Sequence, residues 1–155
     1  MKILLALAVL LLAVSARADF QLLEFSAAYL DVTPESGGNS STFQLAWNPT
    51  IGLGGVDLRG DLGLAFPKPF DTTITIIDYQ LLLRLPLIPL FSIEGGGGWQ
   101  TWVNSGGTHG IVSANLNLDL PFKLIVIDRF FAGYSRYFLP NDGVNEYRLG
   151  VGISL

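Results

Sequence analysis

Apolar and polar residues alternate one by one along several segments of this 155-residue chain. The apolar positions of the clearest segment, residues 56–66, are Val56, Leu58, Leu62, Leu64 and Phe66. Residues 112–120 and 147–155 show the same period of two. Successive side chains of a β-strand point to opposite faces, so this period predicts strands whose two faces meet different environments. The pattern favours an all-β fold.

Seven breaks divide the chain into eight such segments. Six breaks contain proline, which has no N–H for a β-ladder. The prolines are Pro34, Pro49, Pro67, Pro69, Pro86, Pro89, Pro121 and Pro140. The seventh break is the glycine-containing sequence 104–107. The expected strands are 20–31, 41–48, 56–66, 73–85, 90–102, 109–120, 123–138 and 144–155. Most approach the roughly 9–11 residues that a tilted strand needs to cross a bilayer.

The N-terminal residues have the features of a cleavable signal peptide. Lys2 precedes an unbroken apolar run over residues 3–14, and Ala16-Arg17-Ala18 fits the small-x-small cleavage rule. The alternative is a membrane anchor, but twelve apolar residues form a helix of only about 18 Å. We therefore expect residues 1–18 to be a signal peptide of an exported protein and residues 19–155 to be one barrel domain.

The composition excludes several function classes. Charged residues are 14% of the chain, and residues 1–18 carry two of the nine basic side chains but none of the thirteen acidic ones. An acidic chain with so few lysines offers no basic stripe for nucleic acid. The absence of cysteine excludes thiolate chemistry, and a single histidine makes a transition-metal site improbable. We expect neither a cofactor nor a metal.

The direction of the apolar face decides between two kinds of barrel. A soluble, lipocalin-like barrel would turn its apolar face inward to hold a greasy ligand. Here the polar face lacks lysine and is rich in glycine, which suits a crowded interior better than a solvated surface. The sequence thus predicts an eight-stranded antiparallel up-and-down transmembrane β-barrel.

Aromatic residues near the strand ends predict girdles at the two water–lipid boundaries. The predicted girdle residues are Phe20, Trp47, Phe66, Phe91, Trp99, Trp102, Phe122, Tyr137 and Tyr147.

Charged residues on the polar face predict a plugged, salt-bridged lumen, because eight strands enclose a space that side chains just fill. The predicted lumen residues are Glu24, Asp57, Arg59, Asp61, Asp78, Arg84, Glu94, Asp119, Asp128, Arg136, Glu146 and Arg148. In segment 123–138 the adjacent Asp128 and Arg129 leave the local register open. Because acids outnumber arginines, the alternative function is a narrow cation-preferring channel.

The signal peptide, eight alternating strands and alternating C-terminal strand resemble the small outer-membrane barrels of the OmpA/OmpX type from diderm bacteria. The resemblance implies that both termini face the periplasm and that the barrel contacts outer-membrane lipids and lipopolysaccharide. It also implies a monomer whose C-terminal strand is recognised by the barrel-assembly machinery. In this family that strand usually ends in an aromatic residue, and here Leu155 stands in its place.

Residues 140–147 resemble the last hairpin of the lipid A deacylases, which use a Ser–His–acid arrangement. The preceding strand, residues 130–137, contains Ser135 but no histidine, and Glu146 is one residue late for the family's acid. A serine without a general base is a poor nucleophile. The only histidine, His109, stands at a predicted loop. We therefore expect a structural or surface-interaction protein without catalysis.

Overall fold

The computed structural model describes residues 18–68, 73–104, 106–124, 126–140 and 142–155, so the predicted signal peptide lies almost entirely outside the described residues. These residues form ten strands: β1 (Ala18–Gln21), β2 (Glu24–Pro34), β3 (Ser40–Trp47), β4 (Thr50–Leu53), β5 (Asp57–Ala65), β6 (Ile76–Ile88), β7 (Phe91–Trp102), β8 (Thr108–Leu124), β9 (Ile127–Phe138) and β10 (Gly143–Ser154). A search of the described part of the chain finds no helix with the length and hydropathy to span a membrane.

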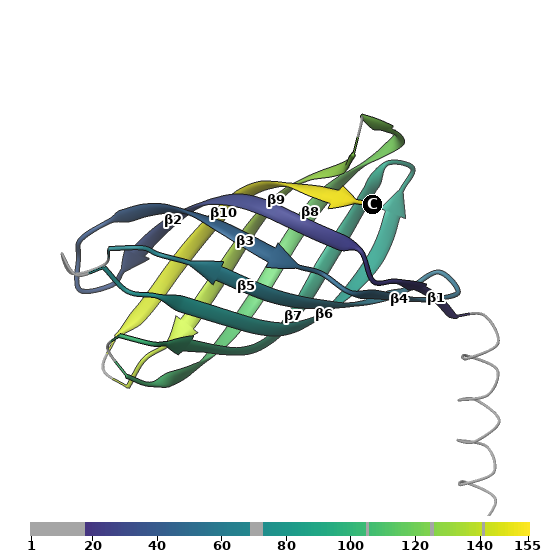
Figure 1. Cartoon of the computed structure of the whole chain (residues 1–155). Helices are drawn as coiled ribbons and strands as arrows, with labels where there is room; N and C mark the ends of the chain where they lie inside the picture. Colours follow the sequence, from purple (N-terminus) through teal and green to yellow (C-terminus); the bar gives the residue numbers. More distant parts are fainter. Residues whose placement is uncertain (1–17, 69–72, 105, 125, 141) are drawn as a thin grey trace, which may run out of the picture.

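The strands close into an eight-membered antiparallel ring (Figure 1). The order is β2-β3-β5-β6-β7-β8-β9-β10, and β10 pairs with β2 along its whole length to close the ring. β1 and β4 pair with each other at one end, and β4 joins the ring through β5. The predicted eight-stranded up-and-down barrel is confirmed.

Pro49 does not mark a hairpin, contrary to the sequence prediction. β3 and β4 lie on either side of Asn48 and Pro49, and both pair with β5, so they are two pieces of one strand. The chain reverses instead at Gly54 and Gly55, whose φ angles of 71° and 118° favour glycine. Pro49 needs no ladder donor at the gap between the two pieces, which is why the strand tolerates it.

Three other prolines also lie within strands and not between them. Pro34 is the last residue of β2, and Pro86 and Pro121 lie within β6 and β8. The β6–β7 register shifts between Pro86 and Ile88, and the β8–β9 register shifts between Asp119 and Leu124. Such irregularities are where a sheet accommodates proline.

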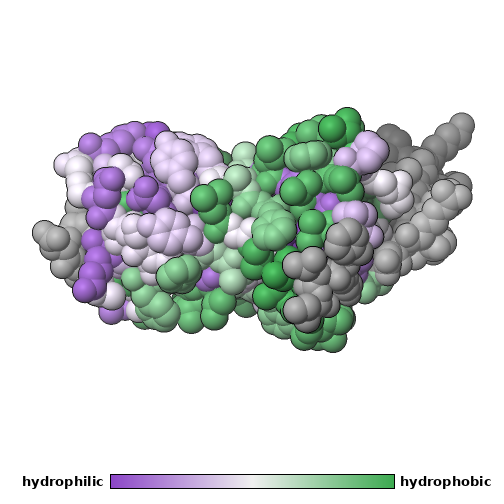
Figure 2. Space-filling view, turned by 90° about the horizontal axis from the view of Figure 1, so that it is seen from above, coloured by the Kyte–Doolittle hydropathy of each residue, from purple (hydrophilic) through white to green (hydrophobic). Residues whose placement is uncertain are grey.

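The barrel has two unlike ends. The turn end carries the connections from β4 to β5, from β6 to β7 and from β8 to β9, together with β1 and the C-terminus, which Figure 1 shows at the right. The loop end carries the connections from β2 to β3, from β5 to β6, from β7 to β8 and from β9 to β10. In Figure 2 the hydrophilic residues gather at the loop end, and the hydrophobic residues cover the wall toward the turn end.

The apolar face points outward, as predicted. In β5, Arg59, Asp61 and Ala65 are buried, whereas Leu62 and Leu64 between them are 47% and 44% exposed. The same alternation runs along β2, β3 and β6. An interior of arginine and carboxylate with an exterior of leucine is the reverse of a soluble domain.

Glycines 95–98 let three strands approach closely. A Cβ at Gly96 or Gly98 would lie 2.1 Å from the backbone oxygen of Leu81 or Tyr79 on β6, and one at Gly97 would lie 2.6 Å from the Ile111 oxygen on β8. At these distances any side chain would push the neighbouring strands apart. The glycines of this run therefore relieve crowding between β6, β7 and β8.

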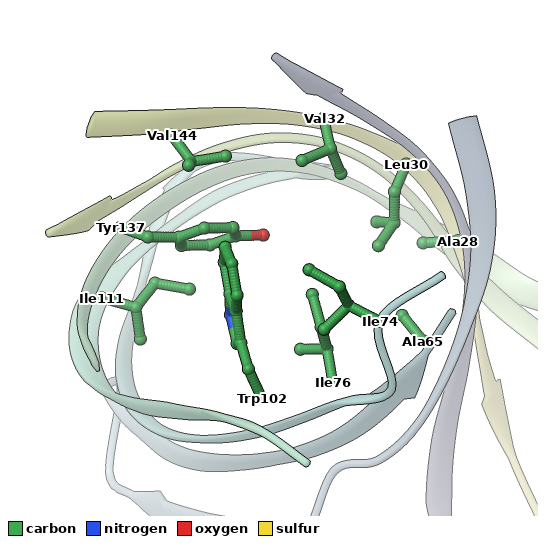
Figure 3. Close-up of a cluster of buried hydrophobic side chains, with 10 residues drawn as sticks. All are labelled: Ala28, Leu30, Val32, Ala65, Ile74, Ile76, Trp102, Ile111, Tyr137 and Val144. Carbon is green, nitrogen blue, oxygen red and sulfur yellow. The ribbon is translucent and has the colours of Figure 1, made fainter. Parts of the chain in front are cut away.

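Apolar side chains fill the interior at the loop end (Figure 3). This apolar cluster consists of Ala28, Leu30, Val32, Ala65, Ile74, Ile76, Trp102, Ile111, Tyr137 and Val144. Every ring strand except β3 contributes to it.

Candidate functional site: the barrel interior

Between the apolar cluster and the turn end, the interior is lined by polar and charged side chains, which we call the polar chamber. Its charged members are Glu24, Asp57, Arg59, Asp61, Asp78, Arg84, Glu94, Asp119, Arg129, Glu146 and Arg148. Ten of these eleven are predicted lumen residues. The exception, Arg129, was left undecided by the sequence.

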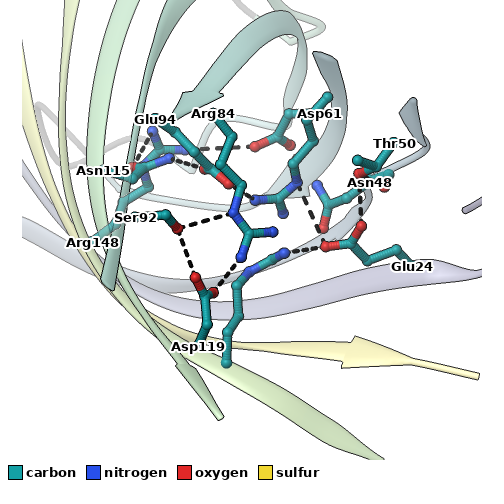
Figure 4. A network of polar contacts seen from close by, with 12 residues as sticks. Glu24, Asn48, Thr50, Asp61, Arg84, Ser92, Glu94, Asn115, Asp119 and Arg148 are labelled. Carbon is teal, nitrogen blue, oxygen red and sulfur yellow. Dashed lines mark hydrogen bonds and ion pairs between the residues drawn. The ribbon is translucent and has the colours of Figure 1, made fainter. Parts of the chain in front are cut away.

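One ion-pair network of the chamber joins Glu24 and Glu94, both labelled in Figure 4, through Arg59. Its Nη1 donates to Glu94 Oε1 at 2.8 Å, and its Nε lies 3.9 Å from Glu24 Oε1. Glu24 also accepts hydrogen bonds from Arg129 and from Thr50 Oγ1, the latter at 2.6 Å. All these side chains are buried, so each charge is compensated by an opposite charge and by hydrogen bonds, as buried ions require.

A second group lies closer to the apolar cluster and is rich in carboxylates. Arg148 lies 3.8 Å from Asp61 Oδ2 and 3.5 Å from Glu146 Oε1. Asp78 has no arginine within ion-pair distance and instead accepts hydrogen bonds of 2.6 Å each from Gln44 Nε2 and Gln100 Nε2. Two of these three buried carboxyl groups therefore pair with one guanidinium, and the third is held by two side-chain amides.

The chamber ends in a polar cavity of about 250 Å³ at the turn end. Its lining residues are Gln21, Gly55, Asp57, Arg84, Pro86, Ser92 and Asp119. Arg84 pairs with Asp119, and the Ser92 hydroxyl accepts from Arg84 Nε and donates to Asp119, both at 2.9 Å. Arg84 and Asp119 are partly exposed, so this cavity is the mouth of the chamber.

Several buried polar atoms of the chamber have no protein partner. Asn48 and Asn117 are fully buried, and both the amide nitrogen and the oxygen of each side chain are unpartnered. Asp61 Oδ1 and Arg129 Nε and Nη2 are in the same condition. Buried polar atoms without protein partners are usually satisfied by internal water.

Arg136 does not lie in the lumen, contrary to the prediction. Within β9 the buried residues are Arg129, Ser135 and Tyr137, so odd-numbered residues face inward. Arg136 lies on the outer face at the loop end, where it pairs with Glu35 and donates to Asn145 Oδ1 at 3.2 Å. The same phase turns Arg129 inward, and Asp128, at the register shift between β9 and β10, is half-buried with a buried, unpartnered Oδ1.

Two predicted girdle residues, Trp102 and Tyr137, belong to the apolar cluster instead and are 6% and 0% exposed. The period of two explains both errors, because Trp99 and Trp102 are three residues apart and Tyr137 is adjacent to Phe138. Six predicted girdle residues are exposed at the surface: Phe20, Trp47, Phe66, Phe91, Trp99 and Tyr147. The side chain of the ninth, Phe122, lies outside the described residues.

Of the residues considered for catalysis, Ser135 and Glu146 are opposite each other on β9 and β10, but His109 does not join them. The hydroxyl of Ser135, fully buried, lies 2.8 Å from the hydroxyl of Ser113. Glu146 contacts Tyr137 and Arg148, and His109 packs edge-on against Trp102 with ring centroids 5.3 Å apart. Within the described residues, no group of three or more acidic or histidine side chains could hold a metal ion.

Comparison with known proteins identifies the fold. No protein-family model and no curated protein sequence matches the chain. Several solved structures match it, among them the three that follow. The crystal structure of Ail, the attachment invasion locus protein of Yersinia pestis, has a TM-score of 0.60 and 12% identity, covering 89% of this chain and 97% of that one. Neisserial surface protein A has a TM-score of 0.59 and 11% identity, covering 89% and 99%. Ail in a phospholipid bilayer nanodisc has a TM-score of 0.57 and 13% identity, covering 85% and 99%.

This chain has the fold of the small eight-stranded outer-membrane β-barrels. The agreement spans nearly the whole length of each neighbour, and it confirms the architecture that the OmpA/OmpX-type resemblance implied. Because the identity is 11–13%, the likeness concerns the fold alone.

Proposed function

We propose that the protein is a small outer-membrane barrel of a diderm bacterium, with a plugged, salt-bridged interior and a structural or surface-interaction role. The observation that carries this proposal is the reversed distribution of polarity. Leucines and aromatic rings cover the outside of the wall, while paired arginines and carboxylates fill the inside. Only a surrounding lipid phase makes such a wall stable.

Lipid and lipopolysaccharide are the proposed contacts of the wall. Pairs of aromatic rings lie across neighbouring strands on the outer face, namely Tyr29–Phe43, Tyr79–Trp99 and Tyr134–Tyr147. Amphipathic rings of this kind prefer the boundary between lipid and water. One of the structural neighbours, Ail, was itself studied in a phospholipid bilayer. We further propose a monomer whose C-terminal strand, β10, is recognised by the assembly machinery.

The loop end is the proposed surface for contact with other molecules, and its first and last loops are tied together. Ser36 Oγ donates to Asp142 Oδ2 at 2.5 Å, and the Glu35 backbone N–H donates to the Gly143 oxygen at 2.9 Å. The Arg136–Glu35 ion pair joins the same two loops. A small, tethered, polar surface suits a structural or binding role.

The interior supports the proposal of a role without catalysis. Ser135 contacts another serine and no histidine, so its hydroxyl lacks the general base that a nucleophile requires. The paired carboxylates lie in salt bridges and not in an open cleft.

The test is heat-modifiability in separated membrane fractions. Folded outer-membrane barrels resist SDS, so the unboiled protein should migrate differently from the boiled chain and be found in the outer-membrane fraction. A band in the soluble periplasm that migrates identically with and without boiling would refute the proposal.

A further inference from the structure

The polar chamber carries an excess of negative charge. Seven carboxyl groups face four guanidinium groups, and beside the apolar cluster Asp61 and Glu146 pair with Arg148 while Asp78 has only glutamine partners. An interior with such a charge balance attracts small cations and repels anions.

The chamber also has the features of a hydrated space. The side-chain amides of Asn48 and Asn117 and the Oδ1 atom of Asp61 are buried without protein partners. Asn48 lies opposite Asp61 in the register that β3 and β4 share with β5, and Asn117 belongs to β8, so the water that satisfies these groups occupies the polar chamber. At the turn end the mouth cavity links this space to the exterior through partly exposed Arg84 and Asp119.

The apolar cluster closes the opposite end. Trp102, Tyr137 and Ile76 extend toward one another across the barrel in Figure 3, and each is almost completely buried. Both rings are held by hydrogen bonds to polar side chains. Trp102 Nε1 donates to Gln100 Oε1 at 2.5 Å, and the Tyr137 hydroxyl donates to Glu146. An apolar constriction of this kind stops ions because water leaves it.

We propose that the interior is a closed conduit for small hydrated monovalent cations. They enter the acidic chamber from the turn end and are stopped by the apolar cluster, which acts as a dewetted gate. This inference goes beyond a structural role. It explains the excess of carboxyl groups and the unpartnered polar atoms as features that let cations pass when the gate is open.

The first experiment opens the gate by substitution. The double variant Trp102→Ser/Ile76→Ser replaces two cluster side chains with small polar ones that water can wet. In planar bilayers with a KCl gradient, wild type should give no conductance above the lipid background. The double variant should give discrete steps whose reversal potential shifts toward that of potassium. Trp99→Ser is the matched control, because Trp99 lies on the same strand but points outward, and it should behave as wild type.

Adding Asp61→Asn and Asp78→Asn to the opened variant tests the source of selectivity. The conductance should persist while the shift toward the potassium potential is lost. A folded, heat-modifiable opened variant that stays silent would overturn the proposal, and so would one that selects chloride.

A second measurement leaves the apolar cluster unchanged. It therefore tests whether the chamber attracts cations even if the opened variant does not fold. The chain has no cysteine, so Ser92→Cys would place a single thiol at the mouth. A trimethylammonium methanethiosulfonate reagent should modify this thiol faster than a sulfonated one of similar size. Equal rates, or faster reaction with the anionic reagent, would contradict a cation-attracting chamber.

Discussion

Single residues on opposite faces of one strand test which side of the wall meets lipid. Leu62 is exposed on the outer face of β5 and Asp61 is buried inside. Leu62→Arg should lower the free energy of unfolding by about 2–4 kcal/mol if Leu62 lies near the bilayer midplane. Asp61→Asn should cost less, because Arg148 keeps Glu146 as a partner. Urea titration of the barrel in lipid vesicles measures both, and a reversed order would mean that the faces are assigned the wrong way round.

A second residue-scale prediction concerns the buried ion-pair network. Arg59→Met removes the guanidinium that pairs with Glu94, so this buried carboxylate loses its ion-pair partner, while Glu24 keeps Arg129. The expected loss of stability is about 3–5 kcal/mol, the usual result of breaking a buried pair from one side. Arg136→Met is the control, since its pair with Glu35 is solvent-exposed and should matter little. Equal effects on the unfolding midpoint would show that the network adds nothing to stability.

At the scale of elements, the glycine run of β7 sets how closely β6 can approach. Gly96→Ala would place a Cβ 2.1 Å from the Leu81 oxygen, whereas at Gly95 the nearest atom, the Ser113 oxygen, is 3.9 Å away. We expect Gly96→Ala to destabilise the barrel by about 1–3 kcal/mol or more, as overpacking does.

Gly95→Ala should change stability by only about 0.5 kcal/mol, because it meets ordinary van der Waals space. Comparing the two unfolding curves in the same detergent provides the measurement. Similar curves would mean that strand curvature relaxes around Gly96.

At the scale of elements, the sequence did not determine which alternate residues of β9 face inward. Asp128 and Arg129 are adjacent, so unbroken alternation would turn one of them outward, and the local pattern could not decide which. In the structure Arg129 faces inward and contacts Glu24 of β2, while Asp128 occupies the register shift between β9 and β10. That choice then fixes Tyr137 inside and Arg136 outside. The errors at these two positions therefore have one cause.

At the scale of the whole molecule, closure of the ring is the decisive feature. Removing Gly143–Ser154 would expose unpaired edges on β2 and β9. Unpaired backbone groups are not tolerated in hydrocarbon, so the shortened chain should aggregate and lose its heat-modifiable form.

Removing Ala18–Gln21 is the matched control, because β1 pairs only with β4 and lies outside the ring. A chain without β1 should refold in detergent and still migrate as a folded barrel on an unboiled gel. A heat-modifiable chain without β10 would contradict the importance of closure.

The sequence by itself determined three properties: the period of two along segments such as residues 56–66 predicted the fold class, the seven breaks predicted eight ring strands, and the lysine-free, glycine-rich polar face predicted that the apolar face points outward. These are local properties, because alternation within one strand already separates its faces. The tertiary structure alone decided that Gly54 and Gly55, not Pro49, make a hairpin, and that Trp102 and Tyr137 close the loop end. It also decided which charges pair: Glu24 and Arg129 are 105 positions apart, and only the register of a closed ring brings them together.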